Sequence, residues 1–90
     1  MFDVNNIMKE FLKSEQTKIS DVVEYKGNYY FVDSCYTLDH GYETMIFPCT
    51  EEGNVTNWTE LYCDIYGTET EMVDAHKAIV ADITQALCLD

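Results

Sequence analysis

The central stretch of the chain, from Tyr25 to Cys49, constrains the fold more than any other part of the sequence. It is rich in tyrosine, phenylalanine, valine and isoleucine, residue types that suit a pleated, half-buried surface. Turn-forming residues interrupt it at Gly27-Asn28 and at Asp39-His40-Gly41. Two extended runs joined by a short glycine-containing turn predict a β-hairpin, and a third run after the second turn extends the hairpin to a meander.

The alternation of side chains predicts where each strand lies. The second strand carries apolar side chains on both faces, which is typical of a central strand. Pro48 has no N–H to donate to a ladder, so it should lie at the end of the third strand. A fourth strand around Trp58 to Cys63 is favoured over a short helical turn. The three preceding strands are expected at Ile19 to Lys26, Tyr29 to Tyr36 and Tyr42 to Cys49.

Two segments carry the apolar periodicity of a helix. Residues 3 to about 15 place Val4, Ile7, Met8, Phe11 and Leu12 on one stripe, with Asp3 as a candidate N-cap. The second segment begins with Thr68-Glu-Thr-Glu71, a capping box, and its periodicity continues to about Leu87. The fold class predicted for residues 1–90 is therefore a single α+β domain of two layers: an N-terminal helix, a three- to four-stranded antiparallel meander and a C-terminal helix. With both helices on one sheet face, the other face is expected to be partly bare.

Charge is the dominant global property of the sequence. Five lysines stand against 17 carboxylates, which gives 5 − 17 = −12, and the chain contains no arginine. The imbalance is greater after Thr50, where Lys77 is the only cation among nine acids, so 1 − 9 = −8. Binding to nucleic acid depends on cationic side chains, and so does docking to an anionic membrane, so neither is expected. Long-range attraction should instead be toward basic partners.

Cysteine and histidine positions leave two chemical alternatives open. A thiol nucleophile could form near the second turn from Cys35, Asp39, His40 and Glu43, and His76 could bind a metal with Cys35 or Cys63. No Cys-x-x-Cys pair and no glycine-rich oxyanion loop supports either. The sequence favours a protein that is not an enzyme and binds no metal or cofactor. His76 is expected to be a neutral core histidine with one hydrogen-bonded nitrogen, and the cysteines are expected to be free thiols.

The remaining candidate is a surface that binds another protein. Carboxylates cluster in the fourth-strand region and at the start of the second helix, together with tyrosines and the tryptophan. Aromatic side chains supply contact area in protein interfaces, and charge steers association. The predicted partner-binding residues are Glu51, Glu52, Trp58, Glu60, Tyr62, Asp64, Tyr66, Glu69, Glu71 and Asp74.

Three segments, Val23 to Cys35, Gly41 to Phe47 and Trp58 to Leu61, resemble small uncharacterised proteins encoded by phages and mobile elements of Gram-positive bacteria. In those proteins a comparable hairpin precedes a tryptophan-containing segment and a closing helix with a histidine like His76. The resemblance implies a phage or prophage accessory protein, a class rich in small acidic inhibitors of host defence nucleases. Some of these inhibitors imitate the charge of nucleic acid. The matching motifs are structural, so the resemblance assigns no functional residue.

The sequence therefore predicts a small acidic protein-binding module that inhibits a host defence or nucleic-acid-processing protein, in the manner of an anti-CRISPR protein or a nucleic-acid mimic. Its expected partner is a basic or nucleic-acid-binding host protein. The absence of an apolar leader or a long apolar run predicts a cytoplasmic protein without membrane association. Two alternatives stay open. One is a thiol enzyme or metal protein that uses Cys35, His40 and His76, and the other is a module that forms homodimers through the bare sheet face.

Overall fold

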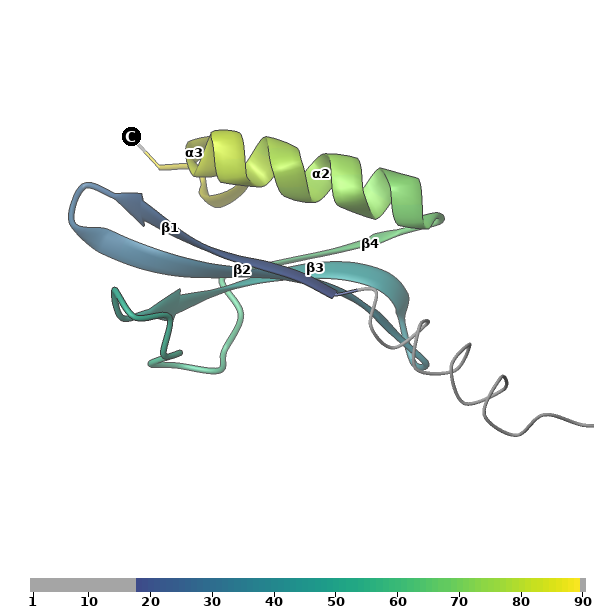
Figure 1. The fold of residues 1–90 in the computed structure, drawn as a ribbon, viewed down its shortest axis with the longest axis horizontal. Coiled ribbons are helices and arrows are strands. Elements are labelled where there is room, and N and C mark those ends of the chain that lie inside the picture. The colour runs from purple at the N-terminus through teal and green to yellow at the C-terminus, as the bar shows by residue number, and fades with distance from the viewer. Residues whose placement is uncertain (1–17, 90) are drawn as a thin grey trace, which may run out of the picture.

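A computed structural model describes residues 18–89, so the helix predicted for residues 3 to 15 lies outside the described part of the chain. The described part is an α+β fold with one antiparallel four-stranded sheet in the order β1-β2-β3-β4. Two helices cover one face of the sheet, which gives the two layers seen in Figure 1. The elements are β1 (Lys18–Tyr25), β2 (Asn28–Thr37), β3 (Gly41–Cys49), β4 (Tyr62–Tyr66), α2 (Glu69–Ala81) and α3 (Ile83–Leu87).

The first hairpin turn lies one residue earlier than the sequence indicated. Tyr25 pairs with Asn28, so Lys26 and Gly27 form the turn, with φ angles of 50° and 84°. Both central residues of a type I′ turn need positive φ, and this turn matches the right-handed twist of the two strands. Asn28 therefore belongs to β2 and not to the turn.

The fourth strand is displaced from its predicted position around Trp58 to Cys63. The backbone N–H of Thr56 donates to the carbonyl of Pro48 (3.0 Å), and the Asn57 side chain accepts from the backbone N–H of Thr59 (2.9 Å). These bonds hold the segment before Leu61 in a loop. Regular pairing with β3 begins only at Tyr62, which lies opposite Ile46.

The helical segment begins as predicted but is divided in two. Thr68 is the N-cap of α2, and its side chain accepts from the backbone N–H of Glu71 (3.2 Å). The Glu71 carboxylate accepts in return from the N–H of Gly67 (3.4 Å). At Asp82 the backbone leaves the helical region, with φ −151° and ψ 89°, and the Asp82 carboxylate accepts from the N–H of Thr84 (3.1 Å). Asp82 thus ends α2 and caps α3, where the sequence predicted one continuous helix.

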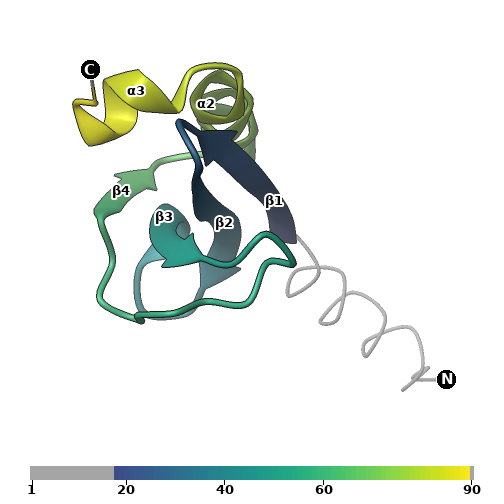
Figure 2. The same ribbon diagram turned by 90° about the vertical axis from the view of Figure 1, so that its left-hand side faces the viewer.

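The core lies between the sheet and the two helices. Val32 and Ile46 come from the central strands, and Met72, Ile79 and Ile83 come from the helices; all five are buried. The far face of the sheet also buries Phe47, whose ring is in edge contact with that of Trp58 at 5.2 Å between centroids. Figure 2 shows the loop between β3 and β4 passing below this far face. The meander and the central position of β2 are therefore confirmed.

Candidate functional site

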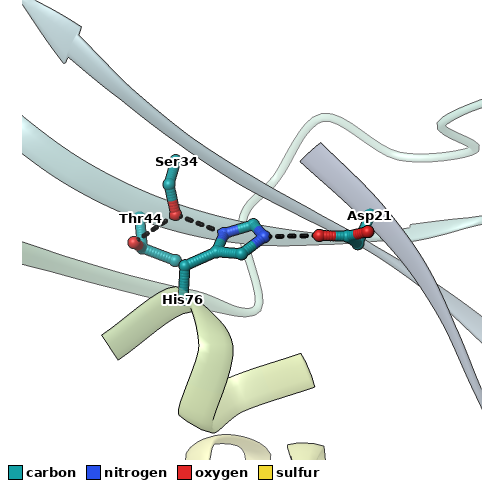
Figure 3. Close-up of polar contacts among 4 residues, drawn as sticks. All are labelled: Asp21, Ser34, Thr44 and His76. Atoms are coloured by element: carbon teal, nitrogen blue, oxygen red, sulfur yellow. Dashed lines mark hydrogen bonds and ion pairs between the residues drawn. The ribbon is translucent and has the colours of Figure 1, made fainter. Parts of the chain in front are cut away.

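A chain of polar side chains crosses the buried layer between α2 and the sheet (Figure 3). His76 of α2 is almost fully buried, and both of its ring nitrogens are engaged. Nδ1 lies 2.6 Å from the Ser34 hydroxyl, and Nε2 lies 2.7 Å from a carboxylate oxygen of Asp21. The Ser34 hydroxyl is in turn 2.6 Å from that of Thr44. Three neighbouring strands and the helix thus share one hydrogen-bonded network.

The directions of these bonds follow from the chemistry of the groups. A carboxylate can only accept, so Nε2–H of His76 donates to Asp21. With a neutral imidazole Nδ1 is an acceptor, and the Ser34 hydroxyl then donates to it and accepts from Thr44. His76 is a core histidine as predicted, but both of its ring nitrogens are hydrogen-bonded where one was expected.

The arrangement of Asp21, His76 and Ser34 is that of a catalytic triad, which the sequence spacing did not reveal. A serine nucleophile must meet its substrate, however, and Ser34 and Thr44 have no exposed surface. The network therefore presents no accessible hydroxyl. Its geometry fits a structural role, because three strands and the helix are fixed in register through one imidazole.

The fold places His76 and the two cysteines considered as its metal partners on opposite faces of the sheet. Successive residues of a strand point to opposite faces, so Cys35 lies on the far face from its neighbour Ser34 and from His76. Within residues 18–89, no group of three or more His, Cys, Asp or Glu side chains is placed to hold a metal ion. His40 does reach Glu43 at 3.4 Å, beside Cys35 on the paired strand. Burial, with the nearby Asp33 and Glu43 carboxylates, raises the pKa of the Cys35 thiol, which is the opposite of what a thiolate nucleophile needs.

The sheet edge formed by β4 borders a groove of about 330 Å³ beneath the two helices, which we call the β4 groove. Ligand sites in proteins generally have volumes of about 300–1,000 Å³, so the groove has room for one long side chain. Figure 2 shows α3 above β4. Its lining residues are Tyr62, Asp64 and Tyr66 of β4, Ala75, Ala78 and Ile79 of α2, and Asp82, Gln85 and Ala86 at α3.

The polar wall of the β4 groove is formed by two phenols with a carboxylate between them. Alternate residues of a strand share a face, so Tyr62, Asp64 and Tyr66 all point toward the helices. Burial strongly raises the pKa of Tyr62, and the neighbouring Tyr66 and Asp64 add to the effect, so this phenol is neutral at physiological pH. The Tyr62 hydroxyl donates to the Asp64 carboxylate at 3.4 Å. The Tyr66 hydroxyl is buried, and its interaction with the Tyr62 phenol contributes to that raised pKa.

Charge is divided between the two flanks of α2. Lys77 lines a second groove of about 320 Å³ on the opposite flank, between α2 and β1, together with Ile19 and Asp21. The other two described lysines, Lys18 and Lys26, lie at the two ends of β1. Among residues 18–89, therefore, every lysine lies either at an end of strand β1 or on the flank of α2 that faces β1. The β4 groove, by contrast, contains two carboxylates and no cation.

The ten residues of the predicted partner-binding surface do not lie at one place. Tyr62, Asp64 and Tyr66 are brought together in the β4 groove. Glu69, Glu71 and Asp74 follow on the exposed first turns of α2, near the end of the sheet where β4 finishes (Figure 1). Glu51 and Glu52 belong to the turn after β3 at the opposite end, where their charges, Glu51 foremost, raise the pKa of Tyr29. Glu60, in the loop before β4, is also exposed.

Trp58, the largest predicted anchor, lies in the loop between β3 and β4. Its side chain is 72% exposed, although one edge of the ring contacts Phe47. Leu61 and Ile65 are also exposed nearby in the chain, at 51% and 52%. The aromatic ring is therefore available to a partner, on the face of the sheet away from the helices.

Two polar residues of the β4 groove, Asp82 and Gln85, were not anticipated from the sequence. Both fall within the helical pattern that was read as continuous to Leu87. The signal available was Asp82 two residues before Thr84, since aspartate is a preferred helix N-cap. Without the break at Asp82, α3 could not turn toward β4 and close the groove.

No protein-family model, curated protein or solved structure matches this chain. Neither α2 nor α3, the two helices described within residues 18–89, has the length and apolar character needed to cross a bilayer. The geometry and charge of the described residues are therefore the basis for assigning a function.

Proposed function

We propose that this chain is an acidic protein-binding module whose partner is a basic or nucleic-acid-binding host protein. The observation that carries the proposal is the division of charge across α2, with Asp64 and Asp82 in the β4 groove and Lys77 on the opposite flank. A surface without cations attracts a basic partner and orients it during approach. The exposed Trp58 ring and the groove phenols offer the aromatic contact area that dominates protein interfaces.

The module acts as an accessory factor of a phage or mobile element that inhibits a defence or nucleic-acid-processing protein in the host cytoplasm. The sequence resemblance to phage-encoded proteins supports this context. Proteins that bind nucleic acid carry clustered lysine and arginine, and these side chains are the complement of the carboxylates on β4 and α2. Occupation of such a basic surface would exclude the nucleic acid, so inhibition follows from competition and needs no chemistry by this chain.

The test is affinity capture from a Gram-positive host lysate over a salt series, followed by an activity assay of the captured protein. We expect capture of a basic or nucleic-acid-binding protein at low salt and progressive loss as salt approaches about 0.3 M, because screening shortens the range of the attraction. The captured enzyme should lose activity when this chain is added in excess. The variant Asp39→Asn removes one exposed charge in the turn before β3 and should capture normally. Capture of no basic protein at any salt concentration would refute the proposed function.

A homodimer is a second candidate, favoured by the outer edge of β1. In a two-residue hairpin the residues that flank the turn form a hydrogen-bonded pair, so alternate residues of β1 direct their N–H and C=O groups away from β2. These are Lys18, Ser20, Val22 and Glu24, and no described strand pairs with them. Light scattering decides this candidate. A dimer that persists in Ser20→Pro, which removes an outward N–H without touching the β1–β2 ladder, would exclude pairing through β1.

A further inference from the structure

We infer that the β4 groove is a receptor for one arginine side chain of the basic partner. The inference rests on the proposed function and identifies the chemical group that this site recognises. A docked arginine would place its apolar stem along the helices and its guanidinium between the carboxylates of Asp64 and Asp82, beside the phenols of β4.

The floor of the groove suits the stem of a long cationic side chain. Ala75, Ala78 and Ile79 of α2 supply small apolar surfaces, and they leave a volume of about 330 Å³. Arginine and lysine side chains cover apolar surface with their methylene groups while the charged end reaches polar atoms. A short polar side chain would leave this apolar floor exposed to water.

The two carboxylates of the groove retain capacity to accept further hydrogen bonds. One oxygen of Asp64 accepts from the backbone N–H of Ile65 (2.9 Å), and the other accepts a long bond from Tyr62 (3.4 Å). Asp82 uses a single oxygen, Oδ1, for its bonds to Thr84. No described lysine or histidine lines the groove, so neither charge is neutralised there. A cation that enters meets two carboxylates, and bonds between charged partners are roughly twice as strong as those between neutral ones.

The phenols favour arginine over lysine. The guanidinium group is planar, stacks on aromatic faces and offers five donors in a fixed fork, whereas the lysine ammonium is a compact, strongly hydrated charge. The buried Tyr66 hydroxyl supplies a further acceptor at the wall of the groove. A guanidinium has five donors spread over a planar fork, enough for both carboxylates and this hydroxyl, whereas an ammonium has three donors at a single point.

The experiment uses the full chain labelled with ¹⁵N and three blocked pentapeptides that differ only in the central residue: arginine, lysine or citrulline, with glycine elsewhere. We expect the arginine peptide to shift the amide signals of β4 and of the stretch from Ala75 to Ala86. Citrulline keeps the shape of arginine without its charge and should bind at least about tenfold more weakly, since a hydrogen bond to a charged group contributes about 1.5–3 kcal/mol. The lysine peptide should bind several-fold more weakly than the arginine peptide.

Matched variants separate the groove from the general negative charge. Asp64→Asn and Asp82→Asn should each weaken the arginine peptide roughly tenfold, because each removes one charged acceptor; asparagine keeps the capping ability of Asp82. Tyr66→Phe should weaken it less, and only through the lost hydroxyl. Asp39→Asn, equal in charge change but outside the groove, should bind as the wild type does.

Equal binding of the arginine and citrulline peptides would overturn the inference. So would amide shifts spread over all acidic segments, or an Asp39→Asn effect as large as that of Asp64→Asn. If these peptides fail while salt-dependent capture of a basic protein succeeds, the arginine receptor is wrong and the proposed function stands. If the arginine peptide binds the groove but no basic protein is captured, the arginine receptor stands and the proposed function is wrong.

Discussion

The substitution Ser34→Ala tests whether the buried network stabilises the fold. The Ser34 hydroxyl makes two hydrogen bonds of 2.6 Å, to His76 Nδ1 and to the Thr44 hydroxyl, and has no exposed surface. Removal of one oxygen leaves both His76 Nδ1 and the Thr44 hydroxyl without this buried partner. Each buried group left unsatisfied costs at least about 1 kcal/mol, and single substitutions seldom cost more than about 4 kcal/mol in total. We therefore expect a loss of about 2–4 kcal/mol in the free energy of unfolding.

This loss is large for a chain of 90 residues, whose total stability should be roughly 5–13 kcal/mol. It corresponds to a fall in Tm of about 10–20 °C. The assay is urea unfolding followed by circular dichroism, with the fluorescence of Trp58 as an independent probe. The matched control is Ser20→Ala, at an exposed position of β1, which should stay within about 0.5 kcal/mol of the wild type.

A double-mutant cycle makes the test stricter. In the wild type, Thr44→Val breaks a buried bond, but in the Ser34→Ala background the Thr44 hydroxyl is already unsatisfied. Thr44→Val should therefore cost less in that background than alone. If Ser34→Ala costs no more than Ser20→Ala, or if the two buried substitutions are simply additive, the network does not fix the strands as described.

Two further predictions concern β1 and its partner strand. Burial raises the pKa of Asp33 above 3.8 despite its ion pair with Lys18, so the charged carboxylate destabilises the folded state at neutral pH and protonation relieves it. Asp33→Asn should therefore unfold at a higher urea concentration than the wild type at pH 7. The difference between their urea midpoints should shrink as the pH falls through the raised pKa toward 3.8, and a difference that grows on acidification would contradict this. Lys26→Asn should raise the unfolding free energy by about 0.5–1 kcal/mol, because asparagine tolerates the left-handed conformation at φ 50° better than lysine. Thermal unfolding measures this effect, and a lower Tm would show that the turn does not limit the hairpin.

Local chemistry made much of this fold predictable. The pattern from Ile19 to Cys49 identified three strands of the meander, because side-chain alternation and turn residues act over a few neighbouring positions. The cap at Thr68 marked the start of α2 to within one residue for the same reason. The errors occurred where loop hydrogen bonds decide the structure, as at Thr56 before β4 and at Asp82 between the helices.

The candidate site was predictable only in part. Tyr62, Asp64 and Tyr66 were identified from composition, and the fold places them on one wall of the β4 groove. Asp82 and Gln85 were missed because they join that wall only through the break between α2 and α3. The acids after β3 and those at the start of α2 are separated because the sheet runs between them, a distance that closeness in sequence does not reveal (Figure 1).

The sequence by itself determined the excess of negative charge, the absence of arginine, the first three strands of the meander and the capped start of the second helix. These are sums over residues or patterns of adjacent residues, so they need no knowledge of distant contacts. Only the tertiary structure decided that Asp21 and His76, 55 positions apart in the chain, share a hydrogen bond. It also decided that Lys77 faces one flank of α2 while Asp64 and Asp82 border the other. Such placements depend on how the helices pack across the sheet, which is set by the burial of the whole core and not by any single segment.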